Sequence, residues 1–261
     1  GAAVSVMLIR AGVSPIATLP IAFLAGALAG MVTGLLNTAL GIPGILASIL
    51  TQISLYSINL NIMGKANQPV SVDNYPLVVS LRYVTDGSVS RLLFFLGMIV
   101  FLLALIAVMY WYFGTEQGHA IRATGCNGNM ARAQGINTNF IKVLALMISN
   151  GLVGLCGALY GQFQGASDVN MGRGAIVIGL AAVIIGEVLF GKFASKRKLA
   201  FAFTLASVIL GAVIYYMVYQ FVLWLKMPSE DMKLFSAIVV AIFLAIPYLK
   251  EKRTLRKGAS K

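Results

Sequence analysis

Few side chains in this sequence are of the types that carry out catalysis. His119 is the single histidine, and it has no nearby carboxylate pair or cysteine pair with which to bind a metal or form a catalytic group. Cys126 and Cys156 are too far apart in sequence to form a short metal-binding motif or a disulfide framework. Because no nucleophile elbow or paired-carboxylate arrangement occurs either, the sequence predicts that this chain is not an enzyme.

One segment is similar to a nucleotide-binding loop. The residues Gly186 to Lys192 read GEVLFGK, but Phe193 stands where the motif requires the Ser or Thr that binds magnesium. We therefore expect no nucleotide at this segment. Glu187 is an acid within an apolar run, and such residues are candidates for function. Since Lys192 follows within about one and a half helical turns, an ion pair at the inner membrane edge is favoured over proton coupling.

The composition is typical of an integral membrane protein. Hydrophobic residues make up 59% of the chain and charged residues only 11%, with a mean hydropathy of +0.88. The 261 residues suffice for roughly six or seven spans of about 20 residues each. Because basic residues accumulate on the cytoplasmic side of membrane proteins, the net charge of +12 indicates a membrane partner and not a nucleic acid.

Uncharged runs locate the expected spans. No charged residue occurs from Ala11 to Gly64, which is long enough for two spans separated at the break Gly41-Ile42-Pro43-Gly44. A broken or re-entrant helix at this break is the alternative. The apolar start before Arg10 is too short to cross, so we expect a further helix upstream. Other spans are expected at 92–113, 143–167, 174–190, 199–225 and 234–249.

A polar loop at 114–139 interrupts two of these runs and contains a candidate short helix at Asn127 to Gln134. If this loop is cytoplasmic, its side of the membrane carries thirteen lysine and arginine residues, against six on the opposite side. The sequence therefore predicts that the loop is cytoplasmic. The basic tail at 250–261 is predicted on the same side, where it would contact lipid headgroups or solvent.

Glycines at every fourth position predict close packing between helices. Asn37 lies on the face of the first glycine set, and Asn150 and Gln164 lie on the face of the second. These amides would either hydrogen bond between helices or line a hydrated path. The two sets are Gly26, Gly30 and Gly34, and then Gly157, Gly161 and Gly165.

A third polar stripe lies on the expected helix after Gly44. Ser48, Gln52, Tyr56 and Asn59 fall within about 80° of one another around a helix. Four polar groups on one face are unfavourable against lipid, so this face should meet protein or a substrate path. Their neutral, amphipathic character suits a small polar or zwitterionic solute.

The stretch ATGCNGNMARAQGIN, the helix ending GALYGQFQG and the run MGRGAIVIGLAAVIIGE resemble the permease subunits of bacterial ABC importers. The similarity is to the family that serves branched-chain amino acids and ribose-type sugars. Glu187 to Gly191 and Cys126 to Asn129 are most similar to members associated with tryptophan or tyrosine uptake. The break at Gly41 to Gly44 also resembles that family's discontinuous helix.

The resemblance implies an all-α, polytopic transmembrane bundle over 1–261, with a cytoplasmic coupling helix, in the bacterial cell membrane. It also implies a partner ABC ATP-binding subunit that holds ATP and magnesium, an extracellular solute-binding protein, and a second permease copy in a homodimer. The chain itself would hold no cofactor. The residues implied to contact the ATP-binding subunit are Asn129, Met130, Arg132, Ala133, Gly135 and Ile136.

The expected function is ATP-driven import of a small polar solute, most simply an amino acid. The resemblance to members associated with tryptophan or tyrosine uptake implies an aromatic one. A permease for a sugar or nucleoside is one alternative. An ion-coupled secondary transporter is another, and Glu187 is its candidate coupling group.

Overall fold

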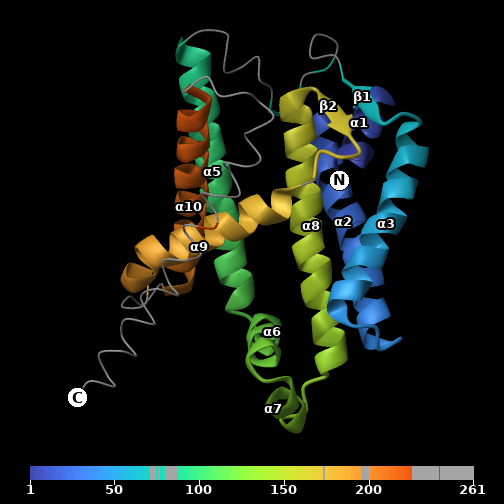
Figure 1. The fold of residues 1–261 in the computed structure, drawn as a ribbon, viewed down its shortest axis with the longest axis vertical. Helices are drawn as coiled ribbons and strands as arrows, with labels where there is room; N and C mark the ends of the chain where they lie inside the picture. The colour runs from blue at the N-terminus through green and yellow to red at the C-terminus, as the bar shows by residue number, and fades with distance from the viewer. Residues whose placement is uncertain are drawn as a thin grey trace. The chain divides into compact units, whose positions relative to one another are not determined.

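The computed structural model describes residues 1–70, 75, 77–79, 88–172, 174–194, 200–224 and 241 (Figure 1). Within these residues the chain is helical, as the sequence predicted, apart from turns and one two-stranded ribbon that the sequence did not predict. The helices are α1 (Ala2–Arg10), α2 (Pro15–Thr38), α3 (Gly44–Met63), α5 (Ser88–Phe113), α6 (Glu116–Cys126), α7 (Gly128–Ala133), α8 (Thr138–Gln164), α9 (Ala175–Ala194) and α10 (Ala200–Trp224). The strands are β1 (Asn67–Pro69) and β2 (Ala166–Asp168).

Five described helices are long and apolar enough to cross a membrane. These are α2, α3, α5, α8 and α10, while the apolar stretch Ile178–Phe190 of α9 is shorter. The prediction of a polytopic α-helical membrane protein is therefore confirmed. The expected span at 234–249 and the basic tail at 250–261 lie outside the described residues, apart from Ala241.

The chain forms two compact units. The first contains Gly1–Leu103 and Trp111–Gly172, and the second contains Ala104–Tyr110 and Arg173–Lys261. Helix α5 contributes to both.

The break between α2 and α3 is a turn between two full helices. Helix α3 begins directly after Pro43, and Gly41 has a φ of 65°, a left-handed conformation that glycine adopts without steric cost. The Asn37 side chain donates a hydrogen bond from Nδ2 to the Ile42 carbonyl oxygen at 2.8 Å. This placement agrees with the two-span interpretation and not with a discontinuous or re-entrant helix at this position.

Helices α2 and α8 form the closest helix pair of the first unit. A Cβ added at Gly34 would lie 2.9 Å from the Val143 Cα, and one added at Gly26 would lie 3.1 Å from the Gly154 Cα. Residue numbers rise along α2 as they fall along α8, so the helices are antiparallel. Only glycine permits this backbone approach, because any side chain at these positions would overlap with α8.

Helix α3 packs against α2 through small side chains. Thr33 and Thr51 share a hydrogen bond of 2.9 Å between their Oγ1 atoms, and both side chains are buried. Ala47 is buried on the same face of α3. Most other α3 positions are exposed in the single chain, so α2 covers only one narrow side of α3.

Helix α1 lies across the last turns of α8. A Cβ at Gly161 would lie 3.3 Å from the Ala2 Cβ, which places this glycine at the contact. Val6 and Ile9 are fully buried in a cluster with Val70 and Leu77. The N-terminal segment, too short to cross a bilayer, therefore forms a helix that packs on the first unit.

The strands β1 and β2 join the end of α3 to the end of α8. They pair antiparallel, with Asn67 opposite Asp168 and Pro69 opposite Ala166. Beyond this pairing, the Val70 backbone N–H donates to the Gly165 carbonyl oxygen at 2.8 Å. Figure 1 shows that this ribbon lies at one end of the first unit, while α6, α7 and the turn between α2 and α3 lie at the other. The ribbon and the α6–α7 segment are therefore separated by the length of the helices.

The second unit contains the antiparallel pair α9 and α10. A Cβ at Gly211 would lie 3.0 Å from the Gly186 Cα, so the two glycines face one another across the pair. Ala181, Ile185 and Tyr215 are buried together beside this contact. Close glycine packing thus recurs in both units.

Candidate functional site

The loop predicted to couple to a partner is largely helical. Thr115, Asn127 and Asn137 each cap the start of a helix. The Asn127 Oδ1 accepts hydrogen bonds from the backbone N–H groups of Asn129, at 3.1 Å, and Met130, at 3.0 Å. The Thr115 Oγ1 accepts from the Gly118 N–H, and the Asn137 Oδ1 accepts from the Phe140 N–H. Because each cap satisfies backbone donors at a helix start, α6, α7 and α8 begin at positions fixed by the sequence.

A tight turn ends α7 and directs the chain into α8. Gly135 has a φ of 83°, and its N–H donates to the Arg132 carbonyl oxygen at 3.0 Å. The Ile136 N–H donates to the Ala131 carbonyl oxygen at 3.1 Å. A glycine is favoured here because residues with a side chain rarely adopt this left-handed backbone conformation. Gly135 therefore has a structural reason to occupy its place in the predicted coupling segment.

The predicted coupling residues differ in how far they face outward. Met130 is 63% exposed, while Ala131 beside it is buried. Asn129, Ala133 and Gly135 are also exposed, and Ile136 is half-buried. The segment therefore presents an apolar side chain, Met130, away from its own chain.

Arg132 is engaged within its own chain. Its Nη2 donates a hydrogen bond to the Thr138 Oγ1 at 3.0 Å. Thr138 is buried and is the first residue of α8. The guanidinium carries further N–H donors on an exposed side chain, so it fastens α7 to α8 and can still meet a partner.

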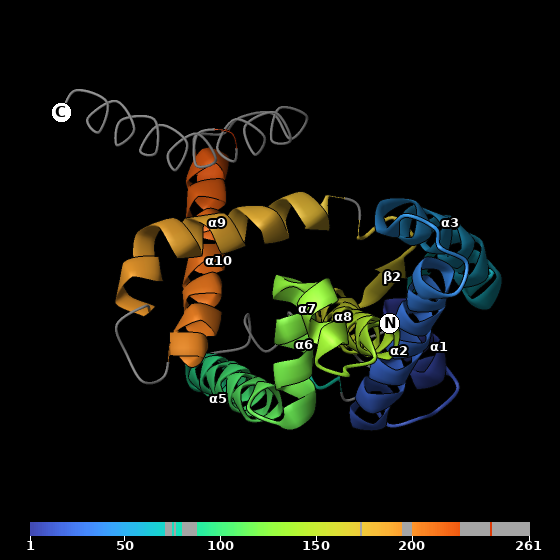
Figure 2. The ribbon, with the colours of Figure 1, turned by 90° about the horizontal axis from the view of Figure 1, so that it is seen from below.

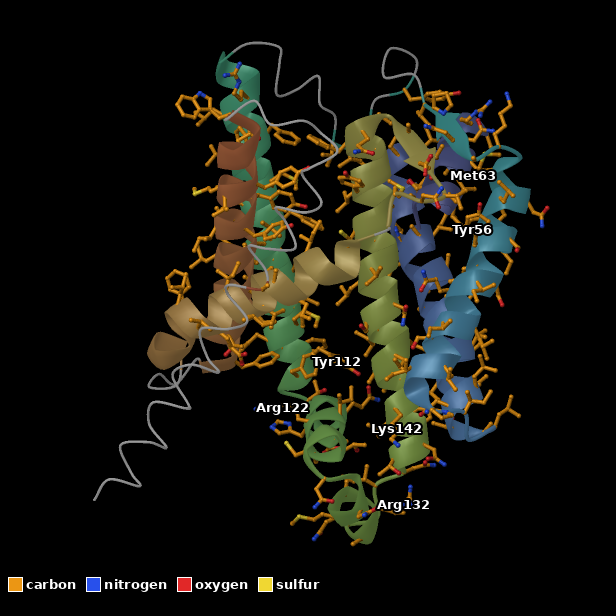
Figure 3. The ribbon with its side chains drawn as sticks, in the orientation of Figure 1. Tyr56, Met63, Tyr112, Arg122, Arg132 and Lys142 are labelled. Atoms are coloured by element: carbon orange, nitrogen blue, oxygen red, sulfur yellow. The ribbon has the colours of Figure 1, made fainter. Side chains whose placement is uncertain are left out.

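Basic side chains gather at the α6–α7 end. Figure 3 shows Arg122, Arg132 and Lys142 where α6, α7 and the first turns of α8 meet, whereas Tyr56 and Met63 lie toward the opposite end of α3. In the view of Figure 2, α6 and α7 lie over the first turns of α8. A basic end with an exposed methionine suits a partner surface that offers acidic groups and an apolar pocket.

The polar stripe predicted on α3 faces away from α2. Ser48, Gln52 and Tyr56 are exposed, and Asn59 is half-buried. The Ser48 hydroxyl donates to its own helix, at the Gly44 carbonyl oxygen. Ala47 on the α2 side lies about 100° to 180° from the four stripe positions around the helix. These side chains thus form a polar face that the described residues leave largely open.

Asn150 and Gln164 lie apart from that stripe, because both are on α8. The Asn150 Nδ2 donates to the Leu146 carbonyl oxygen at 2.9 Å within its own helix. The Gln164 Nε2 donates to the Tyr160 hydroxyl at 2.7 Å on an exposed face. Helix α2 packs against both α3 and α8. The structure therefore does not bring the six predicted path residues together in one site.

The predicted packing glycines also occupy different settings. Gly26, Gly30 and Gly34 face α8, and Gly157 and Gly161 face the start of α1. Gly165 instead ends α8 in a left-handed conformation with a φ of 67°. Its role in the structure is therefore to end a helix and start β2, and not to bring two helices together.

Gln162 is the most buried amide described, and it was not predicted as a functional residue. It is only 1% exposed, and its Nε2 lies 3.2 Å from the Pro15 carbonyl oxygen and 3.3 Å from each of the Ser5 and Thr18 hydroxyls. Its Oε1 accepts a hydrogen bond from the Val78 N–H at 3.1 Å. No motif marks this residue, since its partners come from distant parts of the sequence.

Glu187 lies on α9 in the second unit, and its side chain is exposed. Lys192 lies on the same helix, but its side chain is outside the described residues, so the predicted ion pair stays a prediction. Among the residues that the structure describes, no group of three or more His, Cys, Asp or Glu side chains could hold a metal ion. Cys126 and Cys156 are free and exposed.

Helices long enough to cross a membrane, close glycine packing and a helical basic end that projects an apolar residue define a polytopic membrane protein with a surface suited to a partner. Residues 1–247 match the family described as the branched-chain amino acid transport system permease component, and this chain belongs to that family. It is a multi-pass permease of the bacterial cell membrane, as the resemblance in its sequence implied.

Named relatives are permeases of several transport systems. The chain is 38% identical over 245 residues to a tyrosine transport system permease protein of Clostridioides difficile, covering 94% of this chain and 77% of the relative. It is 28% identical over 226 residues to an autoinducer 2 import system permease protein of Yersinia pseudotuberculosis, covering 85% of this chain and 59% of the relative. An inner membrane ABC transporter permease protein of Escherichia coli is 25% identical over 178 residues, covering 68% and 53% respectively. No solved structure matches this chain.

Proposed function

We propose that this permease imports an amino acid of the aromatic type, such as tyrosine. The observation that carries the proposal is the 38% identity, over 94% of this chain, to a tyrosine transport system permease. The proposal fits the character of the α3 stripe, since amide and phenol groups can hydrogen bond a zwitterion or a phenolic hydroxyl without carrying charge.

The path would run along the stripe of α3, formed by Ser48, Gln52, Tyr56 and Asn59. A second permease copy would cover this face, because exposed polar groups on a membrane helix are unfavourable against lipid. Asn150 and Gln164 would contribute only if the path extended to α8. Their described hydrogen bonds to the Leu146 carbonyl oxygen and the Tyr160 hydroxyl give no support to that extension.

The driving force would enter through α6 and α7. A separate ABC ATP-binding subunit would hold ATP and magnesium. Its apolar pocket would bind Met130, and its acidic groups would contact the basic side chains at the α6–α7 end. Closure of two such subunits around ATP would move α7 and shift the permease between inward-open and outward-open states. An extracellular solute-binding protein would deliver the solute at the end that carries β1 and β2.

The test of the solute is uptake in proteoliposomes that contain the permease, its cognate ATP-binding subunit and its solute-binding protein. We expect ATP-dependent uptake of labelled tyrosine, with competition by tryptophan and phenylalanine and none by leucine or ribose. Uptake of ribose and not tyrosine would favour the sugar alternative, which the autoinducer 2 permease relative supports. Uptake that continues without ATP and stops when the proton gradient collapses would favour a secondary transporter.

The docking surface is tested by Met130→Asp. Met130 is 63% exposed, so the substitution should leave insertion of the chain intact while placing an acid against an apolar and acidic pocket. We expect loss of co-purification with the ATP-binding subunit. Asn170→Asp is the matched control, since Asn170 is exposed in the turn after β2, at the end of the first unit opposite to α6 and α7. Normal co-purification of Met130→Asp would overturn this docking surface.

A further inference from the structure

Gln162 joins three parts of the first unit through one buried amide. Its Nε2 donates toward the Pro15 carbonyl oxygen and the hydroxyls of Ser5 and Thr18, at 3.2 to 3.3 Å. The hydroxyls of Ser5 and Thr18 are 2.8 Å apart, and the Thr18 hydroxyl donates to the Pro15 carbonyl oxygen at 2.7 Å. Every polar atom of this cluster therefore has a partner in a buried setting, where an unpaired one would be strongly unfavourable.

The opposite end of the same amide holds a segment of the loop beyond β1. The Oε1 of Gln162 accepts a hydrogen bond from the Val78 N–H at 3.1 Å. Leu77 and Val79, on either side of Val78, are buried, and Leu77 packs in the cluster with Ile9. We name residues 77–79 the outer segment. It is fixed to α1 by apolar packing and to α8 by the Gln162 hydrogen bond.

Helix α8 connects this point to the α6–α7 end without interruption. Its 27 residues run from Thr138, which accepts the Arg132 hydrogen bond, to the turn that contains Gln162. At 1.5 Å per residue its length is about 40 Å. Because a continuous helix is stiff along its axis, a displacement of α7 at one end reaches Gln162 at the other.

We propose that Gln162 is a positioning residue of the transport cycle, which transmits movement of α8 to the outer segment at 77–79. This inference rests on the proposed function, in which an ATP-binding subunit displaces α7. The outer segment then follows α8 at the side where the solute would be delivered. Without the amide, only the apolar packing of Leu77 on α1 holds the outer segment, and apolar contacts that can slide transmit the movement of α8 poorly.

The two ends of the amide have different partners, so variants can separate coupling from stability. Gln162→Met keeps the length of the side chain and removes both the Nε2 donor and the Oε1 acceptor. Gln162→Glu retains an oxygen that can accept from the Val78 N–H. Thr18→Val disturbs only the cluster on the Nε2 side and leaves the bond to Val78 in place. Ser149→Ala is the matched control, a loss of a polar group at an exposed position of the same helix that has no predicted role.

The experiment uses the complete complex in proteoliposomes, in a Cys126→Ser, Cys156→Ala background that carries Val78→Cys. Val78 is 37% exposed and its backbone N–H survives the substitution. A membrane-impermeant maleimide reports the outer segment, with and without vanadate trapping of ATP. In the chain that retains Gln162, we expect the labelling rate of the thiol introduced by Val78→Cys to differ about tenfold between the vanadate-trapped and the untrapped complex. A tenfold change corresponds to one hydrogen bond of about 1.4 kcal/mol.

Gln162→Met should abolish this difference and reduce uptake about tenfold, while ATP hydrolysis by the complex stays within about twofold. Gln162→Glu should restore the difference. Thr18→Val should lower the unfolding temperature and leave the labelling difference and the uptake per ATP unchanged. If Gln162→Met fails to assemble, the test falls to Gln162→Glu. Loss of the labelling difference in Gln162→Glu would then overturn the proposal. A retained labelling difference together with a lowered unfolding temperature would support the proposal.

A labelling difference in Gln162→Met equal to that of the Ser149→Ala control would overturn the role of Gln162. Uncoupling by Thr18→Val would also overturn it, because the amide would then be purely structural. Neither result affects the proposed function, which ATP-dependent uptake tests separately.

Discussion

Gly26 and Gly154 face each other so closely that a Cβ at either residue would lie 3.1 Å from the Cα of the other. The same contact continues along α2 and α8 at Gly30 and Gly34. In lipid, helices gain little from the hydrophobic effect on associating, so backbone packing of this kind is a main source of attraction. The α2–α8 pair is therefore the rigid element on which the first unit is assembled.

Gly30→Ala should separate α2 from α8. The added Cβ would lie 2.9 Å from the Met147 Cα and would overlap with the Leu146 carbonyl oxygen, neither of which can turn aside as a side chain can. We expect a loss of about 1 to 3 kcal/mol in the free energy of unfolding. The measurement is the unfolding temperature in detergent.

Gly97→Ala provides the control for Gly30→Ala. Gly97 lies within α5, and nothing comes within 4 Å of a Cβ placed there. Alanine should leave stability unchanged or raise it slightly, since it has the higher helix propensity. Equal unfolding temperatures for the two variants would contradict the close packing of α2 on α8.

Thr138→Val should weaken the attachment of α7 to α8. It removes the hydroxyl that accepts from the Arg132 Nη2, and it retains the shape of a buried side chain. We expect the ATP-binding subunit still to co-purify, because Met130 and the exposed surface of α7 are unchanged. Stimulation of ATP hydrolysis by solute should fall about threefold to tenfold, as α7 then moves independently of α8.

A double-mutant cycle with Arg132→Met checks the Arg132–Thr138 contact. If the hydrogen bond carries the effect, the double variant should lose no more stimulation than either single variant. Additive losses would indicate that Arg132 acts on the partner and not on Thr138.

Gln52→Leu tests the α3 stripe as part of the path. The substitution keeps an exposed side chain on a membrane helix and removes its amide. We expect the uptake rate to fall about tenfold, with normal assembly and normal binding of the ATP-binding subunit. Ser54→Leu is the matched control, since Ser54 is exposed on the opposite side of α3 and its hydroxyl bonds only to the Leu50 carbonyl oxygen. Normal uptake in Gln52→Leu would remove the stripe from the path.

The spans were predictable because hydropathy records them directly. The predicted span at 92–113 corresponds to α5, and that at 199–225 corresponds to α10. The short helix predicted at Asn127 to Gln134 is α7. Helix α6 was not predicted, because EQGHAIRATGC has two glycines and no clear apolar stripe, and its start depends on the Thr115 cap.

Contacts between distant residues were beyond the reach of sequence patterns. Gln164 falls on the helix face of Gly157 and Gly161 and was predicted to meet protein or a path for that reason, yet its side chain is exposed. Gln162, two residues earlier, is the one that α1 and α2 enclose. Periodicity identifies the side of a helix that is polar, but the neighbours that bury it become apparent only from the fold.

The pairing of β1 with β2 sets an order on how the chain is made and inserted. Asn67 lies beside Asp168, and α5 and α8 are both synthesised between them. The two strands can pair only after α8 has inserted into the bilayer and its C-terminal end, which leads into β2, has crossed the membrane. Pairing of β1 with β2 is therefore a late step in the folding of the first unit, and it occurs long after α2 and α3 have left the ribosome.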